Sequence, residues 1–245
     1  MKQENYIRGM IMIILSAFFF ACMNVSVRLA GDLPPVQKSF FRNLVAAFFA
    51  AIILIKNHTA PKVEKTQWGS LFLRCAFGTL GILCNFYAID HLLVADASIL
   101  NKLSPFFAII FSFLLLKEKI KPAQAMCVIL AFVGCLFVVK PGFENAHLIP
   151  ALIGVCGGLG AGIAYTMVRK MGTHGVKGPV IVFYFSCFSC IIVIPWIVFH
   201  YQPMSLRQLL TLLLAGLFAA GGQFTITAAY TYAPVSYTHL RAHET

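Results

Sequence analysis

Charged residues are scarce in this sequence. Asp, Glu, Lys and Arg make up 11% of its 245 residues, against about 25% in an average soluble domain. Apolar residues make up 60%, more than the interior of a soluble domain of this length buries. The composition therefore excludes an ordinary soluble enzyme. It also excludes a disordered chain, which would need low hydrophobicity.

The sequence also lacks the motifs of nucleotide, metal and cofactor sites. It has no Walker loop, no His-Glu-x-x-His and no paired carboxylates. Cys187 and Cys190 have the spacing of a redox motif. However, all eight cysteines lie in or beside apolar runs, where inert thiols are the favoured interpretation. We therefore expect no cofactor, no metal site and no enzymatic activity.

Long apolar runs are what the sequence has in abundance. A helix needs about 20 mostly apolar residues to cross a bilayer, and eight such runs occur with short connections between them. The runs cover residues 9–28, 36–56, 68–89, 95–116, 122–140, 148–169, 178–199 and 208–232. We predict an all-α polytopic membrane protein.

The distribution of lysine and arginine indicates an orientation. With the N-terminus inside, the inner segments hold eleven of these residues and the outer segments four. This positive-inside bias predicts a multi-pass protein of the inner or plasma membrane with a cytoplasmic N-terminus. It also explains the net charge of +11 without a nucleic-acid partner. The expected surroundings are a lipid bilayer, and the sequence leaves a homodimer open.

The last eleven residues, 235–245, break the apolar pattern abruptly. Their eleven codons can be written so that they match, base for base, the transposase adapter used in making sequencing libraries. We therefore expect 235–245 to be an adapter-derived tail and the native sequence to stop at Pro234.

An internal repeat is detectable as weak self-similarity. Asn85 in the third span matches Gln223 in the eighth at an offset of 138, each followed by phenylalanine, and Arg28 matches Arg169 at an offset of 141. The order fits a unit of five spans used twice in inverted orientation. Eight spans of an expected ten are then present. The predicted units are a first repeat, 1–141, and an incomplete second repeat, 142–234.

Three cations lie inside the predicted spans, where a charge is costly and marks a functional candidate. Arg42 and Lys102 each lie about seven residues from the outer end of their span. One interpretation is a cluster that binds an anionic or zwitterionic metabolite, with Asn101 and Pro105 grouped at a kink beside Lys102. The alternative is internal charge pairing, with Lys102 extending to the surface. For Arg74 we favour extension to lipid phosphate.

Two aspartates flank the outer turn between the third and fourth spans. Asp90 and Asp96 are candidates for coupling or gating. For Asp96 we favour the alternative that it caps the fourth span at its N-terminus. For Asp90 we favour an interfacial role over a proton relay.

Polar side chains within the spans share helix faces. Gln223, Thr227 and Tyr230 follow the spacing i, i+4, i+7, and Asn85 occupies the place equivalent to Gln223. Such faces line a cavity or form hydrogen bonds between helices, and for Gln223 and Asn85 we favour the cavity. Further cavity candidates are Asn24, Tyr87 and Tyr165. The four-residue spacing of Gly154, Gly158 and Gly162 predicts close helix packing.

One continuous stretch resembles a known family. It runs from Asn85 through the polar hinge before Pro105 to Lys117-Glu118-Lys119, and ends at Val138-Val-Lys-Pro141. Together with Phe41-Arg42, these residues make the chain similar to the EamA-type branch of the drug/metabolite transporter superfamily over 9–234. The resemblance implies ten helices and export or exchange of small metabolites through a central cavity by alternating access. It also implies that Glu118 is a gate or brace.

The function expected from these features is gradient-driven secondary transport of a small polar metabolite. An integral-membrane enzyme acting on a lipid is an alternative, for which Asp90, His91 and Asp96 are the only group of acids and histidines at one interface, and no nucleophile accompanies them. A non-transporting structural or regulatory subunit is another, which would tolerate neutralising Arg42 and Lys102.

Overall fold

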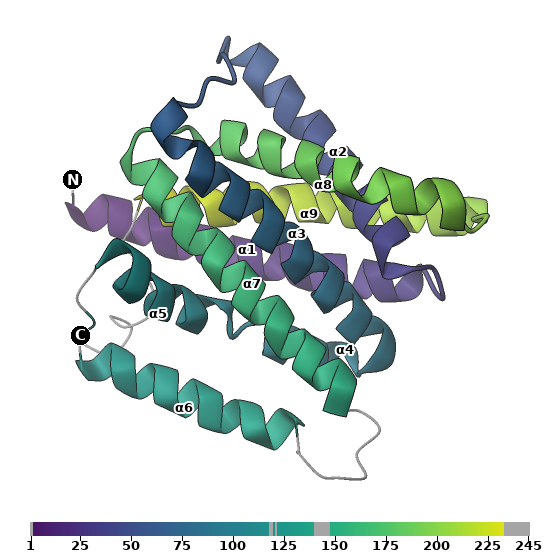
Figure 1. Ribbon diagram of the computed structural model, residues 1–245, viewed down its shortest axis with the longest axis horizontal. Coiled ribbons are helices and arrows are strands. Elements are labelled where there is room, and N and C mark those ends of the chain that lie inside the picture. The colour runs from purple at the N-terminus through teal and green to yellow at the C-terminus, as the bar shows by residue number, and fades with distance from the viewer. Residues whose placement is uncertain (1, 118–119, 121, 140–147, 233–245) are drawn as a thin grey trace.

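The computed structural model describes residues 2–117, 120, 122–139 and 148–232, and every regular element within them is a helix (Figure 1). The elements are α1 (Lys2–Leu29), α2 (Pro35–Lys56), the 3-10 turn η1 (Lys65–Gln67), α3 (Trp68–His91), α4 (Val94–Asn101), α5 (Ser104–Leu116), α6 (Pro122–Val139), α7 (Leu148–Thr173), α8 (Gly178–His200) and α9 (Leu206–Tyr232). Glu118 and the tail 235–245 lie outside the described residues.

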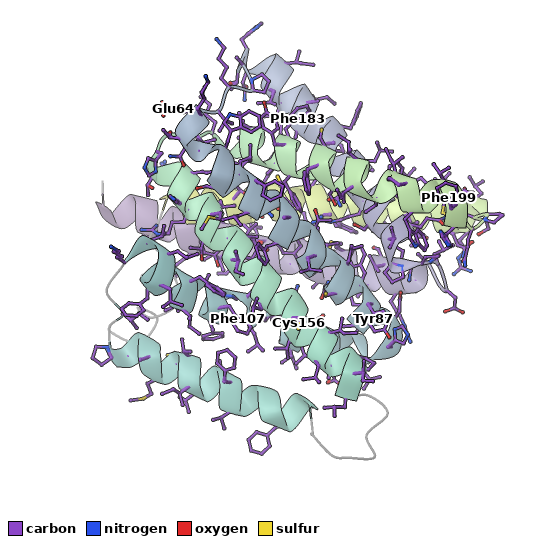
Figure 2. The ribbon with its side chains drawn as sticks, viewed as in Figure 1. Glu64, Tyr87, Phe107, Cys156, Phe183 and Phe199 are labelled. Carbon is purple, nitrogen blue, oxygen red and sulfur yellow. The ribbon has the colours of Figure 1, made fainter. Side chains whose placement is uncertain are left out.

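Seven helical segments are long and apolar enough to cross a membrane, with α4 and α5 counted together as Val94–Leu116. In α6 the described apolar stretch is shorter, Ala125–Gly134. Apolar side chains cover the outside of the bundle. One example is Phe199 of α8, which is 80% exposed (Figure 2). Such a surface requires lipid as its solvent. The predicted all-α polytopic membrane fold is confirmed.

Three helix pairs make the most extensive contacts: α3 with α7, α1 with α9, and α2 with α8. The α5 helix packs on α7, and α2 also packs on α9. By contrast, α6 lies at the edge of the bundle and contacts only its neighbours α4, α5 and α7 to any extent (Figure 1). The six paired helices therefore enclose the middle of the molecule.

Glycines allow α7 to approach its neighbours on two faces. A Cβ on Gly160 would lie 2.9 Å from the backbone oxygen of Phe77 in α3. On the other face, Gly154, Gly158 and Gly162 pack against α4 and α5, and a Cβ on Gly162 would collide with Cβ of Phe107. This is the close packing that the four-residue spacing predicts.

The fourth span is broken in its middle. The α4 helix ends at Asn101 and α5 begins at Ser104, with Pro105 in the first turn of α5. Proline is tolerated there because the first turn needs no N–H donor for intrahelical bonding. The break lies where the sequence predicts a kink, and it leaves Lys102 between the two halves.

The predicted N-cap role of Asp96 is wrong. The α4 helix begins at Val94, with Leu93 at the cap position and no side-chain capping bond. Asp96 is therefore the third residue of the helix. Its charge still lies in the first turn, where the helix dipole favours an anion.

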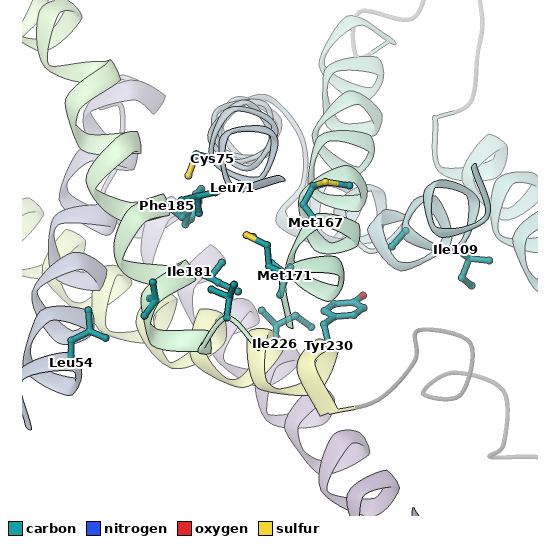
Figure 3. Packing of buried hydrophobic residues seen from close by; sticks show 14 residues of the cluster. Leu54, Leu71, Cys75, Ile109, Met167, Met171, Ile181, Phe185, Ile226 and Tyr230 are labelled. Carbon is teal, nitrogen blue, oxygen red and sulfur yellow. The ribbon is translucent and has the colours of Figure 1, made fainter. Parts of the chain in front are cut away.

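The largest group of buried apolar residues lies between α2, α3, α5, α7, α8 and α9. Phe185 of α8 lies beside Leu71 and Cys75 of α3, and Tyr230 lies beside Ile226 in α9 (Figure 3). Phe185 and Tyr230 also face the polar centre described below, so this packing holds two of its walls in place.

Candidate functional site

Two arginines meet in the middle of the bundle. Arg42 of α2 and Arg74 of α3 are each 1% exposed. Both guanidiniums lie over the ring of Phe185, with Cζ 3.9 Å from the ring centroid for Arg74 and 6.0 Å for Arg42. At these distances the ring face attracts a cation. The prediction that Arg74 extends to lipid is wrong, because its face of α3 points into the bundle.

A glycine makes room for this arrangement. A Cβ on Gly78, one turn after Arg74, would collide with Nη1 of Arg74 and would lie 2.8 Å from Cε2 of Phe185. Any larger residue would push the guanidinium or the ring away. The absence of a side chain at Gly78 therefore positions Arg74 over Phe185.

The hydrogen-bond acceptors of the two arginines are neutral. Arg74 Nη2 donates to Oε1 of Gln223 at 2.9 Å, and Arg42 Nη1 donates to Oδ1 of Asn43 at 2.6 Å. Neither Nε has a hydrogen-bond partner among the described residues. Throughout the described part of the chain, no carboxylate lies within 4.0 Å of either guanidinium. Among the residues that the structure describes, two positive charges are thus buried without a counter-charge, which is costly in a membrane interior.

Two adjoining cavities lie in the middle of the bundle, and the arginines line the first of them. The first, of about 50 Å³, lies between α1, α2, α3, α4, α7, α8 and α9, and the second, of about 270 Å³, lies between α1, α4, α5, α7 and α9. Both are bordered by Phe20, Asn101 and Tyr165, so they are neighbours. Of the residues predicted to form a site, Arg42, Asn85 and Gln223 line the first cavity, Asn24, Lys102, Pro105 and Tyr230 line the second, and Asn101 and Tyr165 line both.

The walls combine amides with aromatic rings. Asn24 donates to Oγ of Ser98 at 3.0 Å, which ties α1 to α4. The rings of Tyr165 and Tyr230 stack with centroids 5.1 Å apart and planes at 19°. Within the part of the chain that the structure describes, the buried hydroxyl of Tyr230 has no hydrogen-bond partner. The site therefore offers polar atoms and a flat aromatic surface side by side.

Two predicted cavity residues lie elsewhere. Tyr87 stacks on His91 near the end of α3, with ring centroids 4.0 Å apart (Figure 2). Thr227 is buried, and its Cγ2 faces Gly178 at the start of α8. The structure brings neither residue to the two cavities.

A second polar cluster ties helices together where α1 ends and α2 begins. We call this the α1–α2 end. Lys38 of α2 is fully buried and forms a salt bridge of 2.5 Å with Asp90 of α3, which is 19% exposed. Arg28 of α1 donates to the backbone oxygens of Ile89 and Asp90 at 2.9 and 2.8 Å. These contacts join α1, α2 and α3.

Further hydrogen bonds connect this cluster to the loop after α8 and to α9. The Gln37 side chain donates to the backbone oxygen of Gln202 and accepts from its N–H, at 2.9 and 3.0 Å. Gln208 donates to the backbone oxygen of Ala30 at 3.1 Å. Polar contacts thus tie α1, α2, α3, α9 and the loop after α8 together at the α1–α2 end.

Sequence reasoning missed three members of these clusters: Lys38, Arg74 as a central residue, and Phe185. One signal was available, because Lys38 and Arg42 are four residues apart and must share a face of α2. No comparable signal marks Phe185, which is one phenylalanine among 23.

Known proteins are similar to this chain in sequence and in fold. Residues 7–140 match the EamA-like transporter family. The pseudopaline exporter CntI of Pseudomonas aeruginosa is 32% identical over 229 residues, covering 91% of this chain and 78% of that exporter. A riboflavin transporter of Brucella anthropi is 25% identical, with 89% and 79% covered.

A solved crystal structure shows the same fold. It has 13% sequence identity and a TM-score of 0.72 over 93% of this chain and 81% of that chain. The likeness at this identity concerns the fold alone. The family and the relatives named above are transporters of small molecules and not enzymes, as the sequence predicts. Because the family match spans more than half of its residues, this multi-pass membrane chain belongs to the EamA-like transporter family.

Proposed function

We propose that this protein is a secondary transporter that exports or exchanges a small polar metabolite through its central cavity by alternating access. The observation that carries the proposal is the convergence of Arg42, Arg74, Asn85 and Gln223 on one buried cavity. Buried polar and ionisable groups in a membrane bundle are costly and mark substrate pathways. An apolar bundle without such a pathway would place aliphatic side chains there.

The helix pairing supports an inverted repeat with the units 1–141 and 142–234. If α1, α2 and α3 correspond to α7, α8 and α9, contact between α1 and α9 must be matched by contact between α7 and α3. These are two of the three most extensive pairs, and the third, α2 with α8, would lie on the symmetry axis. Asn85 and Gln223, equivalent in the repeat, both line the first cavity. Inverted repeats allow one transporter to open to either side in turn.

The proposed transport mechanism also requires an orientation in the membrane, a gate and a hinge. We place the N-terminus in the cytoplasm and the protein in the plasma membrane, so that the α1–α2 end faces outward. The salt bridge between Lys38 and Asp90 then acts as an outer gate. The break at Lys102 and Pro105 acts as a hinge within the fourth span, because a chain without continuous helical hydrogen bonds bends more readily.

The substrates of the relatives support a transport function but do not identify the substrate of this protein. One relative is named for export of pseudopaline and another for transport of riboflavin. The shared architecture therefore serves different small molecules, and the side chains of the cavity must make the choice.

Flux measurements test the proposal. Full-length protein is reconstituted into liposomes, and a panel of small metabolites is followed across the membrane with and without an imposed ion gradient. We expect flux of at least one metabolite, abolished by Arg42→Ala and retained by Arg207→Ala at the exposed start of α9.

Absence of metabolite-dependent flux from well-folded protein would overturn the proposal. A lipid-modifying enzyme would instead change the liposome lipids, and a structural subunit would show neither effect.

A further inference from the structure

Resting on the transport function proposed above, the geometry points to the class of cargo: we propose that it is a small organic anion whose acidic group binds between Arg42 and Arg74. The proposal depends on charge, on available donors and on the shape of the two cavities.

No carboxylate of the described residues neutralises the two arginines. Arg42 and Arg74 are buried near one aromatic ring, and they donate to the neutral amides of Asn43 and Gln223. One turn earlier on α2, the buried Lys38 has the carboxylate of Asp90 at 2.5 Å. A counter-charge is thus present where the helices close and missing from the described surroundings of the cavity. An anion that enters the cavity supplies it.

The donors of the two arginines are available for such a ligand. Each guanidinium has five N–H donors, and both Nε groups lack a partner. A guanidinium fork matches a carboxylate by two parallel hydrogen bonds, stronger than bonds between neutral groups. The Phe185 ring lies against the guanidinium of Arg74, and the missing side chain at Gly78 leaves room for it. Neither contact uses a hydrogen-bond donor of the arginine.

The cavity sizes divide the ligand into two parts. The first cavity has about 50 Å³, and a single water needs about 10–15 Å³ by the same measure. It holds an acidic group and little more. The second cavity has about 270 Å³ and includes the stacked rings of Tyr165 and Tyr230. It accommodates the organic remainder, so inorganic anions alone would use only part of the site.

Ligand-induced thermal stabilisation tests the proposal. Full-length protein in detergent is mixed with acetate, succinate, citrate or benzoate, each compared with its neutral amide. We expect at least one carboxylate to raise Tm in a concentration-dependent manner while its amide does not. Arg42→Gln and Arg74→Gln should each weaken that binding about tenfold or more. The exposed Arg207→Gln should leave it unchanged.

Stability without ligand separates a binding role from a bracing role. Because no carboxylate of the described chain pairs with them, Arg42→Gln and Arg74→Gln should have a Tm at or above that of the wild type. Arg42→Lys keeps the charge, loses the fork, and should bind with intermediate affinity. A Tm lower by several degrees in both glutamine variants would overturn the proposal, because the arginines would then brace the fold.

The remaining outcomes are also decisive. Stabilisation by amides as strong as by carboxylates, binding by no carboxylate in the panel, or unchanged affinity in the glutamine variants would each overturn the anion assignment. Flux of a neutral metabolite that survives Arg42→Gln with Arg74→Gln would leave the transport function standing and reject the anion. Carboxylate binding without any flux would support the anion assignment and reject the transport function.

Discussion

Lys38 and Arg42 lie one turn apart on the same face of α2 and are equally buried, yet their electrostatic surroundings are opposite. Lys38 is neutralised by Asp90 at 2.5 Å. Arg42 contacts an amide and the Phe185 ring, and it shares that ring with a second cation, Arg74. The salt bridge of Lys38 joins α2 to α3 and already neutralises the lysine. Arg42 and Arg74 have no carboxylate partner among the described residues, so they form a site that would stabilise a negatively charged ligand.

The energetic expectation differs accordingly between the two regions. Removing one partner of a buried ion pair strands the other charge, whereas removing a charge that has no partner relieves its desolvation. Substitutions at the α1–α2 end should therefore affect folding, and substitutions around the arginines should affect ligand binding.

The largest effect is expected at the pair. Asp90→Asn leaves the buried Lys38 ammonium without a counter-charge and should lower the free energy of unfolding by about 3 kcal/mol, measured by denaturation in detergent. Asp32→Asn, in the exposed turn before α2, is the control. Adding Lys38→Met to Asp90→Asn should restore most of the loss. If the Asp90 and Asp32 variants were equally stable, the salt bridge between Lys38 and Asp90 would not stabilise the fold. The proposed difference in stability between this pair and the two arginines would then be rejected.

A smaller effect is expected from filling the space beside Arg74. Gly78→Ala places a methyl group against Nη1 of Arg74 and the Phe185 ring. Overpacking should cost about 1–3 kcal/mol and should also weaken carboxylate binding, measured by the ligand-induced shift in Tm.

Two glycine variants separate these effects. Gly162→Ala overpacks α7 against Phe107 away from the arginines, so it should lower stability without changing carboxylate affinity. Gly69→Ala, which meets open space on α3, should change neither. Loss of affinity in Gly162→Ala as large as in Gly78→Ala would mean that binding reports general packing.

The smallest effect is expected at an unsatisfied hydroxyl. Tyr230→Phe removes a buried group that has no hydrogen-bond partner, so stability should rise, by less than about 1 kcal/mol. Tyr184→Phe removes a hydroxyl that donates to the backbone oxygen of Pro61 at 2.8 Å, and it should be neutral or slightly destabilising. The comparison is read from denaturation midpoints. A larger loss for Tyr230→Phe would reveal a partner for its hydroxyl.

Sequence reasoning located the spans and much of the cavity. The break at Lys102 followed from a proline near a polar pair, and Asn85 and Gln223, which line the first cavity, were singled out as polar residues within apolar spans. It misplaced Arg74, Tyr87 and Thr227 because the direction of a side chain was inferred from depth and spacing alone. It missed the pairing of Lys38 with Asp90 because the two residues belong to different helices, 52 positions apart.

The sequence by itself determined that the protein is a bundle of membrane-spanning helices and where each span lies. Bilayer thickness sets the length of every apolar run, and short loops order the runs. Only the tertiary structure decided which face of each helix points inward. In water an apolar stripe marks the buried face, but helices that are apolar all round carry no such mark. The packing of α3 on α7 and of α2 on α8 therefore determined that Arg42 and Arg74 meet over Phe185.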